Sequence, residues 1–213
     1  MKIAISRIHY PVTSLGPGNR VGLWFQGCSI RCEGCISMDT WASGMNEVDI
    51  DEVSYLLESW LPESDGITIT GGEPFDQPSQ LRHILEYCRS YPHISTFIYS
   101  GYPIESLGKH LQSMVGLIDL IMADPLNISY SQRKPIRGSD NQRLVSLSER
   151  GNLLARQIDD SCVEENHLDF TFDGDTAWFA GIPRRGDISA VAEKLQQKGF
   201  DAIAVEDKRA IPE

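Results

Sequence analysis

Three cysteines in one short loop constrain this chain more than any other feature of its sequence. Cys28, Cys32 and Cys35 follow the apolar run at residues 21–25 with a C-x3-C-x2-C spacing. Thiolate is the soft ligand that iron–sulfur clusters and zinc select, and a loop this short brings three sulfurs onto one centre. Three thiolates on a four-iron cluster leave one iron open to a substrate. The spacing therefore predicts a metal or cluster site; structural zinc, redox thiols and ordinary small apolar residues are the alternatives.

Charge and composition narrow the class of protein. The 213 residues suffice for one domain with a substantial core, and the formal net charge of −11 argues against a broad phosphate-binding surface. Nucleic acid is therefore a poor first guess as partner. No apolar run reaches the roughly 20 residues of a membrane-spanning helix, and the start lacks the apolar core of a signal peptide. Because clustered cysteines also suit a reducing compartment, we expect a cytoplasmic protein without a membrane partner.

A glycine-rich motif follows the next β-rich run. Residues 66–70 lead into Gly71, Gly72, Glu73 and Pro74. Two glycines after a strand expose backbone N–H and C=O groups at its carboxyl end, which is where ligands bind in α/β folds. Any strand-to-helix turn can be glycine-rich, so the motif alone is a weak signal. Its position downstream of the cysteine loop makes it a predicted ligand site.

Strand and helix patterns alternate through the first two-thirds of the chain. We expect strands over residues 3–8, 21–25, 66–70, 94–99 and 117–122, and helices over residues 47–60, 76–88 and 104–114. Asp76 is expected to cap the second of these helices, and Cys88 to lie on its core face. This order predicts right-handed βαβ units and an α/β fold with a parallel sheet.

The order of the motifs resembles the radical S-adenosylmethionine (SAM) activating enzymes, in particular the anaerobic ribonucleoside-triphosphate reductase activating proteins. GPGNR, QGC-x3-C-x-GC, TGGEP, FIYSGY and RGSDNQR follow one another over roughly residues 14–147. The resemblance implies a partial (β/α) barrel of the radical SAM type and a [4Fe-4S] cluster on Cys28, Cys32 and Cys35. It also implies that SAM is held near Gly71, Gly72 and Glu73, with Ser100 and Asn141.

The chemistry implied by this resemblance is a one-electron reductive cleavage of SAM. The resulting 5′-deoxyadenosyl radical takes a hydrogen atom from a glycine of a partner, a glycyl radical enzyme, and an electron donor such as flavodoxin or ferredoxin is required. Two other functions stay open: a radical SAM enzyme that modifies a small molecule or peptide directly, and a zinc- or cluster-stabilised binding module. No catalytic side chain, physiological reductant or oligomeric state follows from the sequence.

Several polar residues have both a functional and a structural interpretation. An arginine fork clamps carboxylates and an asparagine amide contacts ribose or adenine, so we favour ligand or partner contacts for Arg137, Asn141 and Arg143. Asp124 precedes Pro125 and is either a ligand-facing carboxylate or a turn residue. The five histidines show no ligand spacing, and we assign them no catalytic role.

Residues 148–213 depart from the resemblance, because the activating proteins usually end soon after the RGSDNQR segment. We expect a radical SAM core over residues 1–147 and a C-terminal αβ appendage over 148–213 that tunes partner or substrate recognition. The appendage should contain a helix around 153–158, a hairpin of 168–172 and 176–180, a helix from Ile188 to Leu195, and a last strand over 200–205. Neighbours on a strand point to opposite faces, so one of the rings of Trp178 and Phe179 should be buried and the other exposed.

Overall fold

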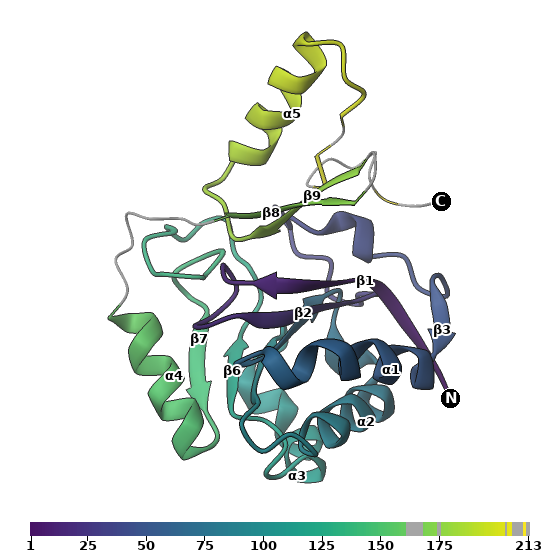
Figure 1. Cartoon of the computed structure of the whole chain (residues 1–213). Coiled ribbons are helices and arrows are strands. Elements are labelled where there is room, and N and C mark those ends of the chain that lie inside the picture. The colour runs from purple at the N-terminus through teal and green to yellow at the C-terminus, as the bar shows by residue number, and fades with distance from the viewer. Residues whose placement is uncertain (161–167, 174–175, 203, 206–210, 212–213) are drawn as a thin grey trace.

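A seven-stranded mixed sheet forms the centre of the protein in a computed structural model that describes residues 1–160, 168–173, 176–202, 204–205 and 211 (Figure 1). The strand order is β3-β1-β2-β4-β5-β6-β7. Strands β2, β4, β5 and β6 run parallel, and antiparallel strands complete both edges. The strands are β1 (Lys2–Val12), β2 (Arg20–Phe25), β3 (Glu47–Asp49), β4 (Gly66–Gly71), β5 (Ser95–Tyr99), β6 (Leu120–Ala123) and β7 (Arg143–Ser146).

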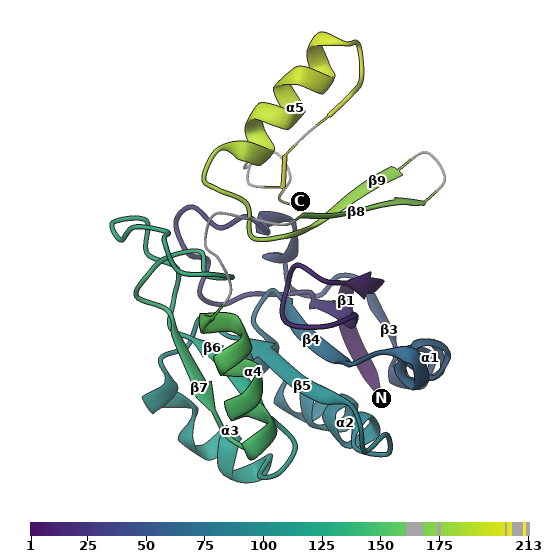
Figure 2. The same cartoon turned by 60° about the vertical axis from the view of Figure 1, so that its left-hand side comes forward.

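Three helices cover one face of this sheet. They are α1 (Ile50–Trp60), α2 (Pro78–Cys88) and α3 (Gly108–Ser113), and each connects two neighbouring parallel strands (Figures 1 and 2). Their apolar residues pack with one set of alternating strand side chains into the main core, which includes Leu23, Ile69, Ile98 and Ile121. Cys88 is fully buried in this core, as predicted.

The opposite face of the sheet is covered by elements from the last third of the chain. Helix α4 (Glu149–Asp159) packs Leu154 and Ile158 against β5 and β6 side chains. The hairpin of β8 (Leu168–Asp173) and β9 (Thr176–Gly181) brings Ala180 onto Trp24 of β2. Helix α5 (Asp187–Gln197) has no buried residue within its described length and projects beyond the hairpin (Figures 1 and 2).

The parallel βαβ arrangement was predictable, and four local features differ from the sequence-based expectation. The first predicted helix begins at Ile50, because Glu47–Asp49 pairs with β1 as an edge strand. Helix α2 begins at Pro78, and Asp76 does not cap it. Strand β7 was not expected. Residues 200–205 form no strand in the part that is described, which leaves out residue 203.

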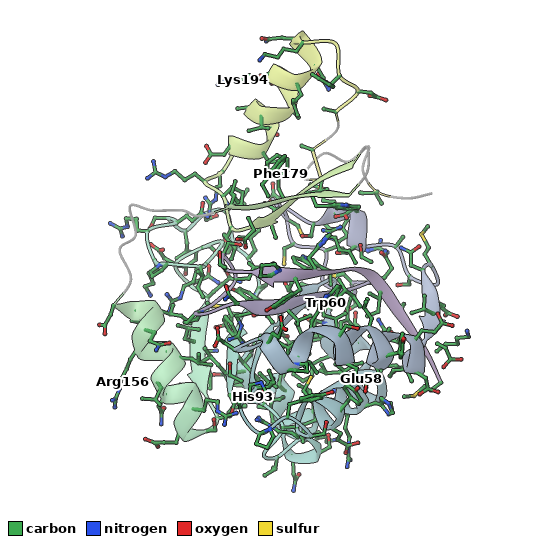
Figure 3. All side chains as sticks on the ribbon, in the orientation of Figure 1. Glu58, Trp60, His93, Arg156, Phe179 and Lys194 are labelled. Carbon is green, nitrogen blue, oxygen red and sulfur yellow. The ribbon has the colours of Figure 1, made fainter. Side chains whose placement is uncertain are left out.

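The hairpin of β8 and β9 and helix α5 confirm two of the expected elements of the tail. Two residues of the expected turn, 174 and 175, lie outside the described part. Phe179 is 41% exposed (Figure 3), which confirms the outward ring of the expected pair. Trp178 is half-buried rather than buried, and its ring centroid lies 5.4 Å from that of His9. The predicted domain division stays a prediction, but α4 packs on the sheet.

Arg20 fixes the amino ends of three parallel strands. Its side chain is fully buried and donates to Thr68 Oγ1 (2.7 Å), Ile67 O (2.8 Å) and both oxygens of Ser95 (2.9 and 3.1 Å). No ion pair to it is found among the described residues, and burial lowers its pKa to about 10. Hydrogen bonds therefore compensate the buried charge.

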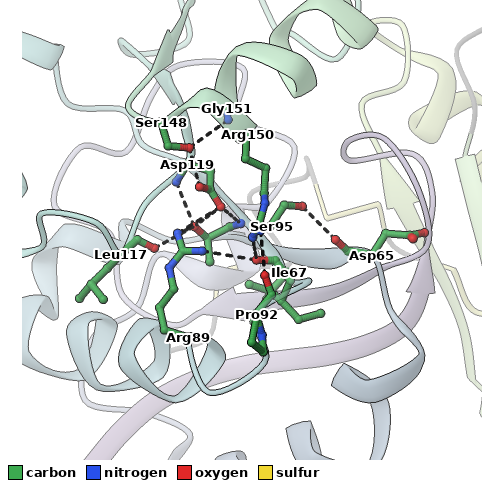
Figure 4. A network of polar contacts seen from close by, with 12 residues as sticks. Asp65, Ile67, Arg89, Pro92, Ser95, Leu117, Asp119, Ser148, Arg150 and Gly151 are labelled. Atoms are coloured by element: carbon green, nitrogen blue, oxygen red, sulfur yellow. Dashed lines mark hydrogen bonds and ion pairs between the residues drawn. The ribbon is translucent and has the colours of Figure 1, made fainter.

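Asp119 joins α2, β5 and α4 at the same end of the sheet (Figure 4). Its carboxylate accepts hydrogen bonds from Thr96 N (2.9 Å) and Ser148 Oγ (2.6 Å) and pairs with Arg89 (3.1 Å). Burial raises the pKa of Asp119, but these hydrogen bonds and the Arg89 charge outweigh burial, so the pKa is lowered overall. The ionised carboxylate is thus a structural partner of three elements.

Asp119→Asn should lower the free energy of unfolding by about 1.5–3 kcal/mol at neutral pH, because hydrogen bonds to a charged group are lost. The folded pKa is lower than the unfolded value of about 3.9, so this stabilisation is complete above that value. It is lost as the pH falls through the folded pKa. Urea unfolding over a pH series measures the difference between variant and wild type.

The matched control is Asp201→Asn, because Asp201 is exposed. This variant should unfold like the wild type at every pH. A deficit of Asp119→Asn that persists undiminished far below pH 3.9 would contradict the role of the charge.

Candidate metal centre

The cysteine loop begins where buried strand β2 ends, and backbone hydrogen bonds fasten it to the end of β4. Glu73 N donates to Gly27 O (2.9 Å), and Gly72 N donates to Phe25 O (2.8 Å). On the other side, Gly27 N donates to Thr40 O (2.8 Å). The loop is therefore held between the GGEP motif and the segment that follows the cysteines.

The junction between the cysteine loop and β4 leaves no space for a side chain, so it requires glycine. A Cβ on Gly72 would lie 2.1 Å from Gly27 O, and one on Gly71 would lie 2.7 Å from backbone atoms of Phe25. Gly27 and Gly71 both have a φ of +96°, which side chains rarely adopt. The cysteine loop therefore occupies the space that a side chain on Gly72 would need.

The three thiols are half-buried, and backbone N–H groups surround them. Burial raises the pKa of all three, while N–H groups act in the opposite direction: those of Arg31 and Ile30 at Cys28, that of Leu126 at Cys32, and that of Ser37 at Cys35. Ser37 N lies 3.3 Å from Cys35 Sγ. Within the described residues, no three His, Cys, Asp or Glu side chains are grouped to hold a single metal ion.

Asp76 fixes the outer side of the cysteine loop. Its carboxylate accepts from Ser29 N (2.8 Å), Ser29 Oγ (3.0 Å) and Tyr102 OH (2.8 Å). Ser29 lies between Cys28 and Cys32, so three loops at the carboxyl ends of β2, β4 and β5 meet at one carboxylate. Asp76 was expected to cap α2, because capping is the local use of an aspartate before a helix; that expectation is wrong, since Gln77 holds the N-cap position.

Glu73 forms a second, buried connection between strand ends. Its carboxylate accepts from Phe75 N (3.0 Å), Ser100 Oγ (3.0 Å) and Gly101 N (2.8 Å). It is 1% exposed, and burial raises its pKa to about 7. Glu73 and Ser100, both expected near SAM, thus contact each other and hold the ends of β4 and β5 together, while Gly71 and Gly72 are half-exposed.

In the RGSDNQR segment, the two arginines pair with other side chains, whereas Asn141 has a side-chain oxygen that accepts no hydrogen bond within the described residues. Arg143 pairs with Asp124 (2.5 Å) and Glu105 (2.8 Å), and Arg137 with Asp159 (3.4 Å). Both arginines and Asp124 therefore have internal partners. Asn141 donates to Pro125 O (2.9 Å), but its Oδ1 is buried and has no hydrogen-bond partner within the described part of the chain.

The donor set fits an iron–sulfur cluster. Thiolates are the ligands of such clusters, and N–H groups that face the ligating sulfurs tune them. A cluster spreads its cysteines over different irons, so it does not require three sulfurs around one ion. Fold and site together define a mixed α/β protein with a three-cysteine centre at the carboxyl ends of parallel strands.

Comparison with known proteins agrees with this centre. A family described as a 4Fe-4S single cluster domain matches residues 14–145. The anaerobic ribonucleoside-triphosphate reductase-activating protein of Enterobacteria phage T4 is 32% identical over 136 residues, which cover 62% of this chain and 86% of the phage protein. The chain therefore belongs to the 4Fe-4S single cluster domain family, among the radical SAM activating enzymes.

Two pyruvate formate-lyase-activating enzymes are further relatives. That of Clostridium pasteurianum is 33% identical over 131 residues, covering 58% of this chain and 52% of the enzyme. That of Streptococcus mutans is 24% identical over 142 residues, covering 62% of this chain and 54% of the enzyme. The chain thus spans about half the length of these two enzymes. The family match ends at residue 145, before α4 begins.

Gly72→Ala should prevent stable assembly of the centre, because the new Cβ forces Gly27 and the cysteine loop away from β4. We expect loss of most iron and sulfide after anaerobic reconstitution, together with a lower melting temperature. Gly108→Ala is the matched control, since no atom lies within 4 Å of a Cβ at Gly108. A Gly72→Ala protein with normal stability and full cluster content would contradict the packing argument.

Proposed function

We propose that this chain cleaves SAM reductively and uses the resulting radical to install a glycyl radical on a partner enzyme, such as anaerobic ribonucleotide reductase. The proposal rests above all on one observation: the loop of Cys28, Cys32 and Cys35 is fastened directly to the end of β4 at Gly72 and Glu73. Relatives named as activating proteins, for anaerobic ribonucleoside-triphosphate reductase and for pyruvate formate-lyase, support it.

The chain's own residues have separate roles in this proposal. When bound, a [4Fe-4S] cluster supplies the electron that cleaves SAM. Cys28, Cys32 and Cys35 provide its thiolates, and their raised pKa values mean that cluster binding releases protons.

SAM would meet the half-exposed backbone of Gly71 and Gly72. The unpaired Oδ1 of Asn141 can accept a hydrogen bond from an amino group of the same ligand. Glu73 and Ser100 would act indirectly, because their mutual hydrogen bond shapes the strand ends on which SAM rests.

We also propose that the parallel strands β2, β4, β5 and β6, with their connecting helices on one face, form the partial barrel of radical SAM enzymes. An external electron donor such as flavodoxin or ferredoxin and a cytoplasmic location are part of the same proposal. Within the described residues, no helix has the length and apolar character needed to cross a membrane.

Cys28→Ala, Cys32→Ala and Cys35→Ala should each abolish cluster incorporation and the production of 5′-deoxyadenosine from SAM. Cys88→Ala is the control: Cys88 is buried on α2, away from the loop, and its variant should retain iron and sulfide. Metal and sulfide analysis of anaerobically reconstituted protein, followed by SAM cleavage with dithionite, measures both effects. The wild type should then give a glycyl radical signal when mixed with a candidate partner. Stoichiometric zinc without sulfide in the wild type would overturn the proposal.

The last third of the chain supports the loop that borders the centre. Arg185 donates to Ile128 O (2.7 Å), Tyr130 O (2.8 Å) and Gly138 O (3.2 Å). That loop also contains Leu126, whose N–H faces Cys32, and leads to Asn141. We therefore propose that the appendage influences recognition by holding this loop in place. We also propose that the appendage begins after α4 rather than before α4.

Arg185→Met should leave cluster content unchanged and weaken SAM binding about fivefold, because the loop loses hydrogen bonds from a charged donor. Hydrogen exchange at residues 128–138 should become faster. Equilibrium binding of SAM to the loaded protein gives the affinity.

Arg184→Met is the matched control, since its exposed side chain neighbours Arg185 without the same contacts in the described structure. Unchanged exchange and unchanged affinity in Arg185→Met would show that the loop holds its position without the appendage.

A further inference from the structure

Asp124 follows strand β6 in a backbone conformation that its sequence context does not favour. Its φ is +83°, and it is one of four non-glycine residues with a positive φ in the described part of the chain. Aspartate adopts such angles more readily than most residues, but they remain sparsely populated. Pro125 comes next, and a proline favours an extended conformation in the residue before it. Contacts from elsewhere in the fold must therefore hold Asp124 in this conformation.

Every polar group of Asp124 makes such a contact. Its backbone N–H donates to Tyr102 O (3.1 Å), and its carbonyl accepts from Gln142 Nε2 (3.3 Å). The carboxylate accepts two hydrogen bonds from Arg143, one from Nε to Oδ2 (2.5 Å) and one from Nη2 to Oδ1 (2.8 Å). A bidentate pair of this kind fixes the direction of both side chains as well as their distance.

The ion pair lies where the backbone pairing of β6 and β7 stops. Ala123 is the last residue of β6, and it is paired with Arg143, the first residue of β7. Beyond this point the two chains are joined by side chains, and the carboxylate of Asp124 reaches across to Arg143. The side chain of Asp124 is only 12% exposed, so little of the carboxylate faces water. The pair therefore continues the contact between the strands into the loops at their ends.

The residue after Asp124 orients the side chain of Asn141. Pro125 O accepts a hydrogen bond from Asn141 Nδ2 (2.9 Å). An asparagine amide has a donor end and an acceptor end, so a carbonyl at the donor end decides which way the amide points. Oδ1 is left as the other end, and it is buried without a hydrogen-bond partner among the described residues. The backbone turn at Asp124 thus determines where this acceptor lies.

We propose that Asp124 is a positioning residue for SAM. Its ion pair with Arg143 holds the backbone turn that orients Asn141, and Asn141 Oδ1 accepts a hydrogen bond from an amino group of SAM. The inference rests on the proposed function. Both carboxylate oxygens of Asp124 are already bound by Arg143, so Asp124 does not itself contact the ligand. Its effect on SAM binding passes through Asn141.

The experiment is a double-mutant cycle on the full-length, cluster-loaded protein, with the dissociation constant of SAM measured by equilibrium binding. Asn141→Ala should weaken binding about tenfold, because a buried hydrogen bond is lost. Asp124→Ala should weaken binding about fivefold, because alanine neither pairs with Arg143 nor readily adopts the positive φ. In the Asn141→Ala background, Asp124→Ala should cause no further loss. A second fivefold loss in that background, or unchanged binding in Asp124→Ala alone, would overturn the inference.

Two further variants separate positioning from other roles of the carboxylate. Asn152 is an exposed asparagine on α4, so Asp124→Ala should keep its full fivefold effect in an Asn152→Ala background. Asp124→Asn should bind SAM within about twofold of the wild type, because asparagine also adopts a positive φ and retains an oxygen that accepts from Arg143. Binding as weak in Asp124→Asn as in Asp124→Ala would assign the effect to charge alone and contradict the positioning role.

Arg143→Gln covers the case in which Asp124→Ala does not fold, because it removes the bidentate pair and leaves residue 124 unchanged. Hydrogen exchange at residues 124–127 should become faster even before cluster and SAM are bound. SAM should bind less tightly to this variant only when Asn141 is present. Unchanged exchange and unchanged affinity would overturn this inference alone. A cluster-loaded wild type that binds no SAM overturns the proposed function and this inference with it.

Discussion

The hydrogen bond from Glu73 N to Gly27 O is the contact on which the rest of the site depends. It joins the loop that carries the thiols to the strand end that carries GGEP, and it requires a backbone approach that a Cβ on Gly72 would prevent. Gly27 and Glu73 lie more than forty residues apart in the sequence. Once they are joined, the position of one determines the position of the other, and the parallel pairing of β2 with β4 supplies the alignment.

Carboxylates around the centre serve mainly as acceptors that hold loops. Asp76 binds Ser29 and Tyr102, and Glu73 binds Ser100 and Gly101. Each carboxylate connects loops from neighbouring strands, so hydrogen bonds to carboxylate oxygens hold the rim of the site together. Within the described residues, neither pairs with an arginine or lysine. Asp76 and Glu73 therefore orient the N–H and O–H groups of these loops without bringing the positive charge of a partner side chain close to the thiols.

The parts of this arrangement that follow from local patterns could be predicted from the sequence. The cysteine spacing, the GGEP turn, the βαβ order and the burial of Cys88 all depend on residues a few positions apart. Contacts over long sequence separations could not be predicted. Asp76 was expected to cap α2, because nothing near it shows that Ser29 lies within reach. Strand β7 was missed because it is only four residues long and not fully buried, so it shows no clear period. The packing of α4 was missed because its partners on the sheet, Phe97 and Leu120, lie far from it in the sequence.

The hydrogen bonds of Arg20 affect how accurately the cysteines are positioned. It lies at the opposite end of β2 from the loop and binds the first residues of β4 and β5 together. Strand β2 is six residues long, so a slip of its pairing by one residue would displace the cysteines by about 3.3 Å and turn its side chains to the wrong face. Each guanidinium hydrogen bond is specific for one register. A fixed number of residues separates Arg20 from Cys28. The strand register that Arg20 sets at the amino end of the sheet therefore determines where the cysteine sulfurs lie at the carboxyl end.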